Sequence, residues 1–82
     1  MLTGEQIRAA RALIRWEQKQ LAADASVSLE TVKRLEGMTG MVSANVSTVH
    51  AIKTTLERAG IIFIAENGEG PGVRLRKEPA AS

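Results

Sequence analysis

A pair of short helices joined by a tight turn constrains the fold more than any other stretch of this sequence. The segment 18–36, QKQLAADASVSLETVKRLE, predicts a first helix over 18–23 and a turn over 24–27. The second helix opens at Ser28, a favourable N-cap residue, and ends before Gly37. Leucine, valine and alanine give both helices an inward side, and the second helix keeps a polar outer side. Such a pair is the architecture that places a helix in the DNA major groove.

One further helix is predicted on each side of this pair. The N-terminal helix covers 3–16, where Thr3 and Gln6 fit a capping box and apolar residues recur at helical spacing. The C-terminal helix covers 46–59, and Asn45 precedes it as a candidate N-cap. The chain is therefore expected to contain four helices.

The pattern changes from helical to extended after Gly60. Residues 61–65, IIFIA, are β-branched or aromatic and predict a strand with both faces largely covered. Residues 73–76, VRLR, alternate apolar and basic, which predicts a half-buried strand, and a turn-rich loop over 66–72 joins the two. An isolated hairpin is marginal in water, so we expect it to pack on the helices or to pair with the same hairpin of a second chain.

The length of 82 residues allows one domain. We assign the domain to 1–77, with the hairpin over 60–77, and expect a flexible tail over 78–82. The chain holds 11 Lys and Arg against 9 Asp and Glu. This mildly basic balance permits a nucleic-acid partner but does not by itself indicate one.

Several classes of function are disfavoured by the composition. There is no cysteine, and the lone His50 falls on a polar helix face, so no metal site and no cofactor is expected. No Gly-rich loop follows a strand and no acid–base pair stands in an evident pocket, so an enzyme is not expected. No small-molecule ligand is evident either. The sequence contains no apolar run of membrane-spanning length and no signal peptide, which favours a cytoplasmic protein.

Residues 7–37, IRAARALIRWEQKQLAADASVSLETVKRLEG, resemble the Cro/cI (XRE) family of small helix-turn-helix transcriptional regulators. Arg, Gln, Leu-Ala, Val-Ser and Leu-Glu elements stand at the spacing of that family. The ending AGIIFI…NGEGPGVRL is similar to compact bacterial regulators in which a hairpin replaces the last helix. The resemblance implies a mainly α fold, namely a lambda-repressor-like helix-turn-helix bundle of four helices with a C-terminal β-hairpin.

The resemblance also implies which residues meet DNA. Gln18 matches the glutamine that grips a phosphate together with a helix N-terminus, and residues 28–34 match the recognition helix. Arg11 and Glu36 match a structural ion pair between the first and third helices. Together with candidate phosphate contacts, the predicted DNA-binding residues are Gln18, Lys19, Ser28, Leu29, Glu30, Thr31, Lys33, Arg34 and Thr39.

The chemistry of the second helix supports this assignment without the family. Leu29 and Thr31 offer methyl groups to a thymine methyl, Glu30 can accept from a cytosine amino group, and Arg34 can bond a guanine edge or a phosphate. Family members often carry Gln, Arg or Ser where this chain has Leu29 and Glu30. An acidic side chain there repels phosphates unless it bonds a base. The alternative is that the charged residues form only a solvated helix face.

The sequence thus predicts a homodimeric regulator, in the first place a repressor, that reads an inverted repeat in double-stranded DNA. The hairpin is the candidate dimer interface, through Ile61, Ile62, Phe63, Ile64, Val73 and Leu75. The alternative for the hairpin is that it only covers its own helical core. Two alternatives for the function remain open: the antitoxin of a toxin–antitoxin pair, and a protein-interaction module that inhibits another regulator.

Overall fold

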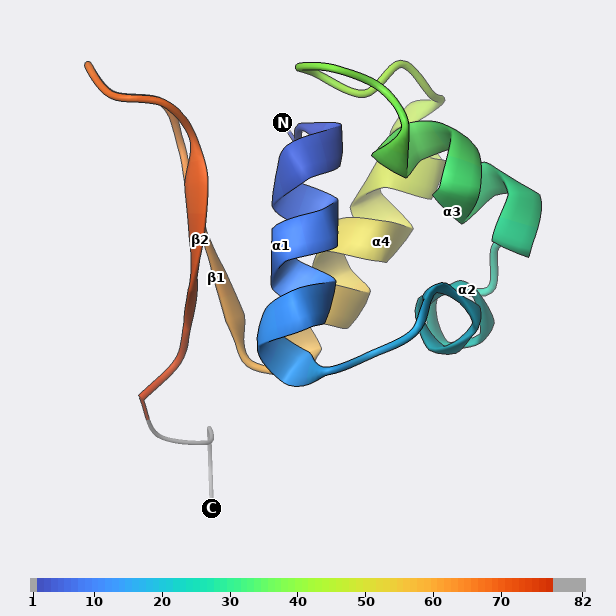
Figure 1. The fold of residues 1–82 in the computed structure, drawn as a ribbon. Coiled ribbons are helices and arrows are strands. Elements are labelled where there is room, and N and C mark those ends of the chain that lie inside the picture. The colour runs from blue at the N-terminus through green and yellow to red at the C-terminus, as the bar shows by residue number, and fades with distance from the viewer. Residues whose placement is uncertain (1, 78–82) are drawn as a thin grey trace.

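Four helices followed by a two-stranded antiparallel sheet make up the computed structural model, which describes residues 2–77 (Figure 1). The elements are α1 (Gly4–Ile14), α2 (Gln18–Ala25), α3 (Leu29–Glu36), α4 (Val46–Arg58), β1 (Ile61–Ile64) and β2 (Gly72–Leu75). The predicted mainly α fold with a C-terminal hairpin is confirmed. The expected tail over 78–82 lies outside the described residues.

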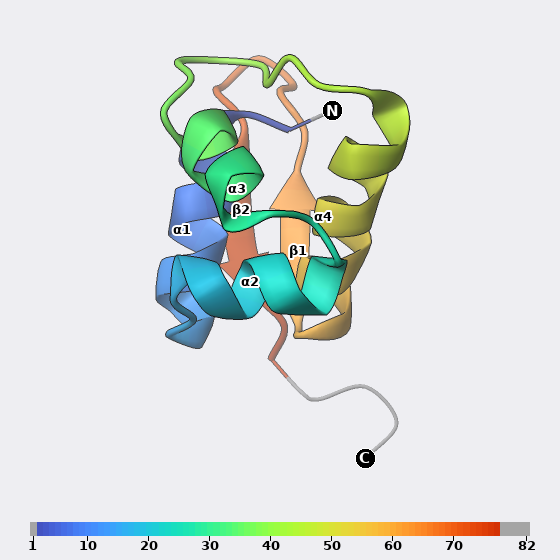
Figure 2. The same ribbon diagram turned by 90° about the vertical axis from the view of Figure 1, so that its right-hand side faces the viewer.

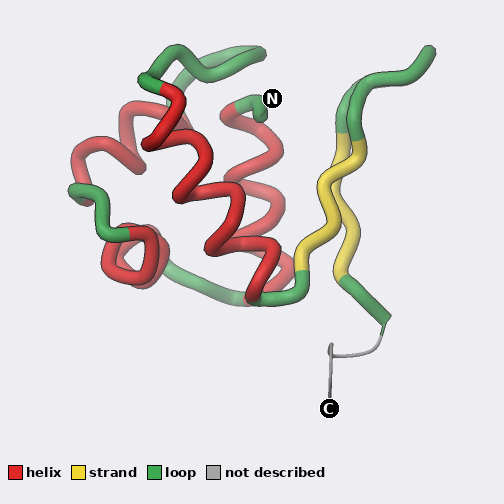
Figure 3. The backbone as a smooth tube through the Cα atoms, turned by 180° about the vertical axis from the view of Figure 1, so that it is seen from behind, coloured by secondary structure: helices red, strands yellow, loops and turns green. Residues whose placement is uncertain are grey.

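The helices α1 and α4 stand between the α2–α3 pair and the hairpin (Figures 1 and 3). β2 packs against α1, β1 packs against α4, and α2 contacts both α3 and α4. Large apolar side chains from all four helices, the N-terminal segment and β1 form one core. Its fully buried members are Leu2, Ile7, Leu21, Val32, Leu35, Ile52, Leu56 and Ile61. No helix within residues 2–77 has the length and apolar character needed to cross a membrane.

The ends of the first two helices differ from the prediction because two non-glycine residues adopt left-handed backbone angles. Arg15 has φ 60° and ends α1 at Ile14, two residues earlier than expected. Ser26 has φ 58° and follows α2, which continues through Ala25 although a turn was predicted from position 24. The turn between α2 and α3 therefore covers only residues 26–28.

The other helix starts follow the predicted caps. The Thr3 hydroxyl accepts the Gln6 N–H at 3.0 Å and the Gln6 side chain accepts the Thr3 N–H at 2.9 Å, which completes the capping box of α1. The side chain of Asn45 accepts the Thr48 N–H at 2.8 Å at the start of α4. Satisfying these backbone donors fixes where each helix begins.

The N-terminal segment is tied to the loop that follows α3. The N–H of Val42 donates to the carbonyl of Leu2 at 2.9 Å, and the N–H of Gly4 donates to the carbonyl of Gly40 at 3.2 Å. This pairing brings the start of α1 and the end of α3 together.

The hairpin has one face against the helices and one face away from them. Ile61 pairs with Leu75, and Phe63 pairs with Val73. Ile61 belongs to the core, while Phe63 and Val73 pack against it. Because side chains alternate along a strand, Ile62 lies on the opposite face. Ile62 and Ile64 on that face are half-buried, so the expectation that both faces of β1 are largely covered is confirmed only in part.

Candidate nucleic-acid interface

Helix α3 presents a polar side outward and an apolar side to the core, on the face of the molecule that it shares with α2 (Figure 2). Val32 and Leu35 are fully buried. Glu30, Lys33 and Arg34 are exposed. The predicted amphipathic character of this helix is therefore confirmed, and three of the predicted contact residues lie on its open side.

A buried ion pair anchors the C-terminal end of α3 to α1. Arg11 donates from Nε to Glu36 Oε2 at 2.7 Å and from Nη2 to Glu36 Oε1 at 2.8 Å. The Glu36 side chain is 3% exposed and that of Arg11 is 20% exposed. The hydrogen bonds to Glu36 raise the pKa of the Arg11 guanidinium above its ordinary value. The predicted ion pair between the first and third helices is confirmed.

The same carboxylate also binds the first residue of α2. Gln18 Nε2 donates to Glu36 Oε1 at 3.0 Å, so its amide points inward rather than toward solvent. Arg11 Nη1 donates to the carbonyl of Trp16 at 2.9 Å, and Arg8 Nη1 donates to the carbonyl of Glu36. These bonds fix α3 relative to α1 and to the start of α2.

The start of α2 forms a small hollow with α3. Glu17 is the N-cap residue of α2 but makes no side-chain hydrogen bond to the first turn. A hollow of about 260 Å³ is lined by Glu17, Gln18, Lys19, Leu29 and Lys33. Four of the nine predicted contact residues therefore meet at one place. Two lysines and the uncapped N–H groups of a helix N-terminus outweigh the single carboxylate of Glu17 in this hollow and favour an anion there.

Other predicted contact residues stabilise the fold through contacts within the chain. The Ser28 hydroxyl accepts the Thr31 N–H at 3.0 Å as the N-cap of α3, and the two hydroxyls lie 2.8 Å apart. Leu29 packs against the core with part of its surface. Glu30 lies in the first turn of α3, where the helix dipole favours a negative charge. The negative charge of Glu30 thus stabilises the start of α3, whether or not this side chain binds a base.

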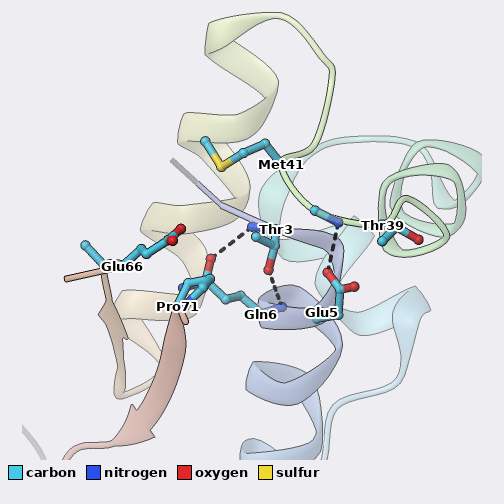
Figure 4. A pocket seen from close by; sticks show the side chains of 9 residues that line it. Thr3, Glu5, Gln6, Thr39, Met41, Glu66 and Pro71 are labelled. Carbon is cyan, nitrogen blue, oxygen red and sulfur yellow. Dashed lines mark hydrogen bonds between the residues drawn. The ribbon is translucent and has the colours of Figure 1, made fainter. Parts of the chain in front are cut away.

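Thr39 lies apart from the other predicted residues. It lines a different cleft of about 680 Å³, between the start of α1, the loop after α3 and the end of the hairpin (Figure 4). Glu5 also borders this cleft and accepts the Gly40 N–H at 3.2 Å. Hydrogen bonds from its own backbone N–H and from Gly40 lower the pKa of Glu5.

Gln6 forms the buried wall of this cleft and is the residue whose importance the sequence did not reveal. Its Nε2 donates to the carbonyls of Gly72 at 2.9 Å and Ile64 at 3.3 Å, while its Oε1 accepts from Thr3. The residue is 3% exposed. Because its donors and its acceptor bind within the chain, we assign this side chain a structural role and no ligand. The only signal in the sequence is the amide itself, since glutamate caps a helix equally well but has no donors.

The predicted dimer residues divide between the two faces of the hairpin. Ile61 has no exposed surface and cannot contribute directly to an interface, which corrects the prediction for this residue. Phe63 and Val73 are half-buried and pack on the core. Leu75 is 47% exposed. By alternation along β1, Ile62 and Ile64 are the residues on the outer face.

Residues 2–77 contain no group of three or more His, Cys, Asp and Glu side chains that could hold a metal ion. No model of a known protein family matches the chain, and no curated protein sequence matches it. The geometry of the α2–α3 face is therefore the basis on which a function can be inferred.

Proposed function

We propose that this protein is a sequence-specific binder of double-stranded DNA that acts as a homodimeric transcriptional repressor in the cytoplasm. The observation that carries the proposal is the arrangement of α3. Its polar side faces outward, while a buried ion pair with Arg11 holds it to α1 and the Gln18 amide holds it to α2. A rigid, outward-facing helix of this kind fits the major groove.

The hollow at the start of α2 supplies the sequence-independent part of binding. A phosphate there would meet the N-terminal N–H groups of α2 and the ammonium groups of Lys19 and Lys33. Contacts of this kind position the protein on the duplex without reading its sequence. The inward Gln18 amide changes the predicted role of that residue, since its side chain positions α2 rather than reaching for the phosphate.

The exposed side of α3 supplies the reading of bases. Arg34 can make two hydrogen bonds to a guanine edge, and Glu30 can accept from a cytosine amino group. The Ser28 and Thr31 hydroxyls bind each other, so their contribution is to fix the start of the helix. Two such helices in successive major grooves would read an inverted repeat and block access of polymerase.

The test is fluorescence anisotropy with DNA from upstream of the protein's own gene and with scrambled DNA, over a series of salt concentrations. We expect selective binding whose affinity falls steeply with salt, because neutralised phosphates release counterions. Lys19→Ala and Lys33→Ala should each weaken binding to both DNAs and reduce the salt slope by about one. Arg34→Ala should instead reduce the preference for the specific DNA, by about 1–3 kcal/mol.

Lys77→Ala is the matched control. Lys77 is exposed and lies two residues after the hairpin, which α1 and α4 separate from α2 and α3 (Figures 1 and 3). Its replacement removes the same charge and should leave the affinity for both DNAs and the salt slope unchanged. Equal, weak binding of the wild type to both DNAs would contradict the proposal. The exposed Glu30 would then favour a protein-interaction module.

A further inference from the structure

Three segments that are distant in the sequence meet around the cleft at the start of α1 (Figure 4). One wall is the start of α1, the second is the loop over 39–41, and the third is formed by Ala65, Glu66 and Pro71 at the loop end of the hairpin. The volume of about 680 Å³ lies within the range of about 300–1,000 Å³ that is typical of small-molecule sites. Because no single stretch of the chain contains this site, the sequence shows no local pattern for it.

Hydrogen bonds between the walls fix the shape of the cleft. The Gln6 amide donates to the carbonyls of Ile64 and Gly72, which ties α1 to the loop end of the hairpin. The Gly40 N–H donates to Glu5 Oε1 at 3.2 Å, which ties α1 to the loop after α3. The cleft is therefore preformed, as small-molecule sites commonly are.

The charged side chains that line the cleft are both carboxylates. Glu5 belongs to the α1 wall and Glu66 to the hairpin wall, and they lie on either side of Thr3 (Figure 4). Both side chains are exposed, and no Lys, Arg or His is among the described residues that line the cleft. Arg8, the nearest cation along α1, donates to the carbonyl of Glu36 instead. The cleft therefore attracts cations and repels anions.

Apolar groups form much of the surface between the two carboxylates. Met41 extends from the loop after α3 over the cleft and is 58% exposed (Figure 4). Ala65 and Pro71 of the hairpin wall are exposed as well. A flexible thioether side chain such as that of Met41 can adapt to the shape of an apolar ligand. A ligand that fits this surface combines positive charge at its ends with an apolar middle.

We propose that this cleft binds an aliphatic diamine. One ammonium group lies beside Glu5 and the other beside Glu66, while the methylene chain between them contacts Met41. Aliphatic ammonium groups resemble that of lysine, whose pKa is about 10.4, so both ends of the ligand are charged at neutral pH. The second oxygen of Glu5 can accept from the ligand, because the Gly40 N–H binds only the first. Exposed ion pairs contribute little energy, so we expect a dissociation constant in the millimolar range.

The site is distinct from the proposed DNA contacts, since Lys19, Lys33 and Arg34 do not line the cleft. An NMR titration of the isotope-labelled protein at low ionic strength, without DNA, tests it. Hexamethylenediamine should shift the amide signals of Gly40, Met41 and other lining residues in a saturable manner. Hexylamine, which lacks one ammonium group, should bind at least about threefold more weakly, and the uncharged hexanediol at least about tenfold more weakly.

Glu66→Gln removes one carboxylate of the cleft and should weaken binding of hexamethylenediamine at least about threefold. Glu69→Gln is the matched control, because Glu69 is exposed in the same loop but does not line the cleft. It should change the dissociation constant by less than about twofold. The amide spectra themselves show whether both variants are folded.

Four results would each overturn the proposal. They are the absence of saturable shifts at the lining residues, hexylamine binding as tightly as the diamine, hexanediol binding as tightly as the diamine, and equal effects of the two variants. Because DNA is absent from the titration, none of these results bears on the DNA-binding proposal.

Discussion

Replacing Glu36 with Gln tests whether the buried ion pair holds α3 in place. The change preserves the size of the side chain but sets an NH₂ group against the donors of Arg11 and Gln18. It also leaves the Arg11 guanidinium, whose side chain is 20% exposed, without its counter-charge. Removing one partner of a buried pair costs about 3–5 kcal/mol, and the partial exposure of Arg11 indicates the lower end, about 3 kcal/mol. For a domain of this size the melting temperature should fall by roughly 12–24 °C.

Urea unfolding followed by the fluorescence of Trp16, the single tryptophan, measures this loss. The matched control is Glu57→Gln, which makes the same change in the Lys53–Glu57 pair. There the side chains are 37% and 39% exposed, and the expected loss is about 0.3–0.5 kcal/mol. Losses that agree within about 0.5 kcal/mol would refute the structural role of the buried pair.

Three further changes test other parts of the structure. Gly4→Ala should destabilise the fold by more than about 1 kcal/mol in urea, because a Cβ there would lie 2.7 Å from the Leu35 carbonyl oxygen. Gly70→Ala, where the space is open, should change the midpoint little, and equal effects would contradict this reasoning. Ser28→Ala should cost about 1 kcal/mol through loss of the α3 cap, and an unchanged midpoint would argue against that cap. Glu5 has a pKa below its ordinary value of 4.5, so its carboxylate stabilises the fold above that pH and loses this effect as the pH falls through the folded pKa. The urea midpoint of Glu5→Gln should therefore lie below that of the wild type at pH 7 and approach it as the pH is lowered below 4.5, whereas a constant difference would refute the assignment.

The features that the sequence predicted well depend on residues close together in the chain. The capping box of Thr3 and Gln6 and the N-cap Ser28 each involve residues three positions apart. Residues of these types at this spacing are typical of the start of a helix. The four helices and the hairpin followed from apolar periodicity. The Arg11–Glu36 pair spans 25 positions, and it came from the family resemblance rather than from periodicity.

The errors have a common physical origin in tertiary context. Arg15 and Ser26 adopt left-handed angles that sequence rules assign to glycine, so two helix ends were displaced. Gln18 was assigned to a phosphate from the family resemblance, whereas its amide donates to the buried Glu36 carboxylate 18 positions away. Thr39 follows α3 closely in sequence, but the pairing of its loop with the N-terminus turns it toward another cleft. Ile61 was predicted to lie in the dimer interface together with the rest of its strand, but its side chain faces the core and is fully buried.

Gln6 shows why such a site can escape a local analysis of sequence. Its capping role is visible at a separation of three residues, but its other partners lie 58 and 66 positions away. Ile64 and Gly72 form the last pair of the sheet before the loop. The Gln6 amide donates to both of their carbonyls and so holds this end of the two strands together. Glutamate would preserve the capping box but present only acceptors to the carbonyls of Ile64 and Gly72. The choice of amide over carboxylate is therefore set by the hairpin, because the same side chain both starts α1 and holds the end of the sheet.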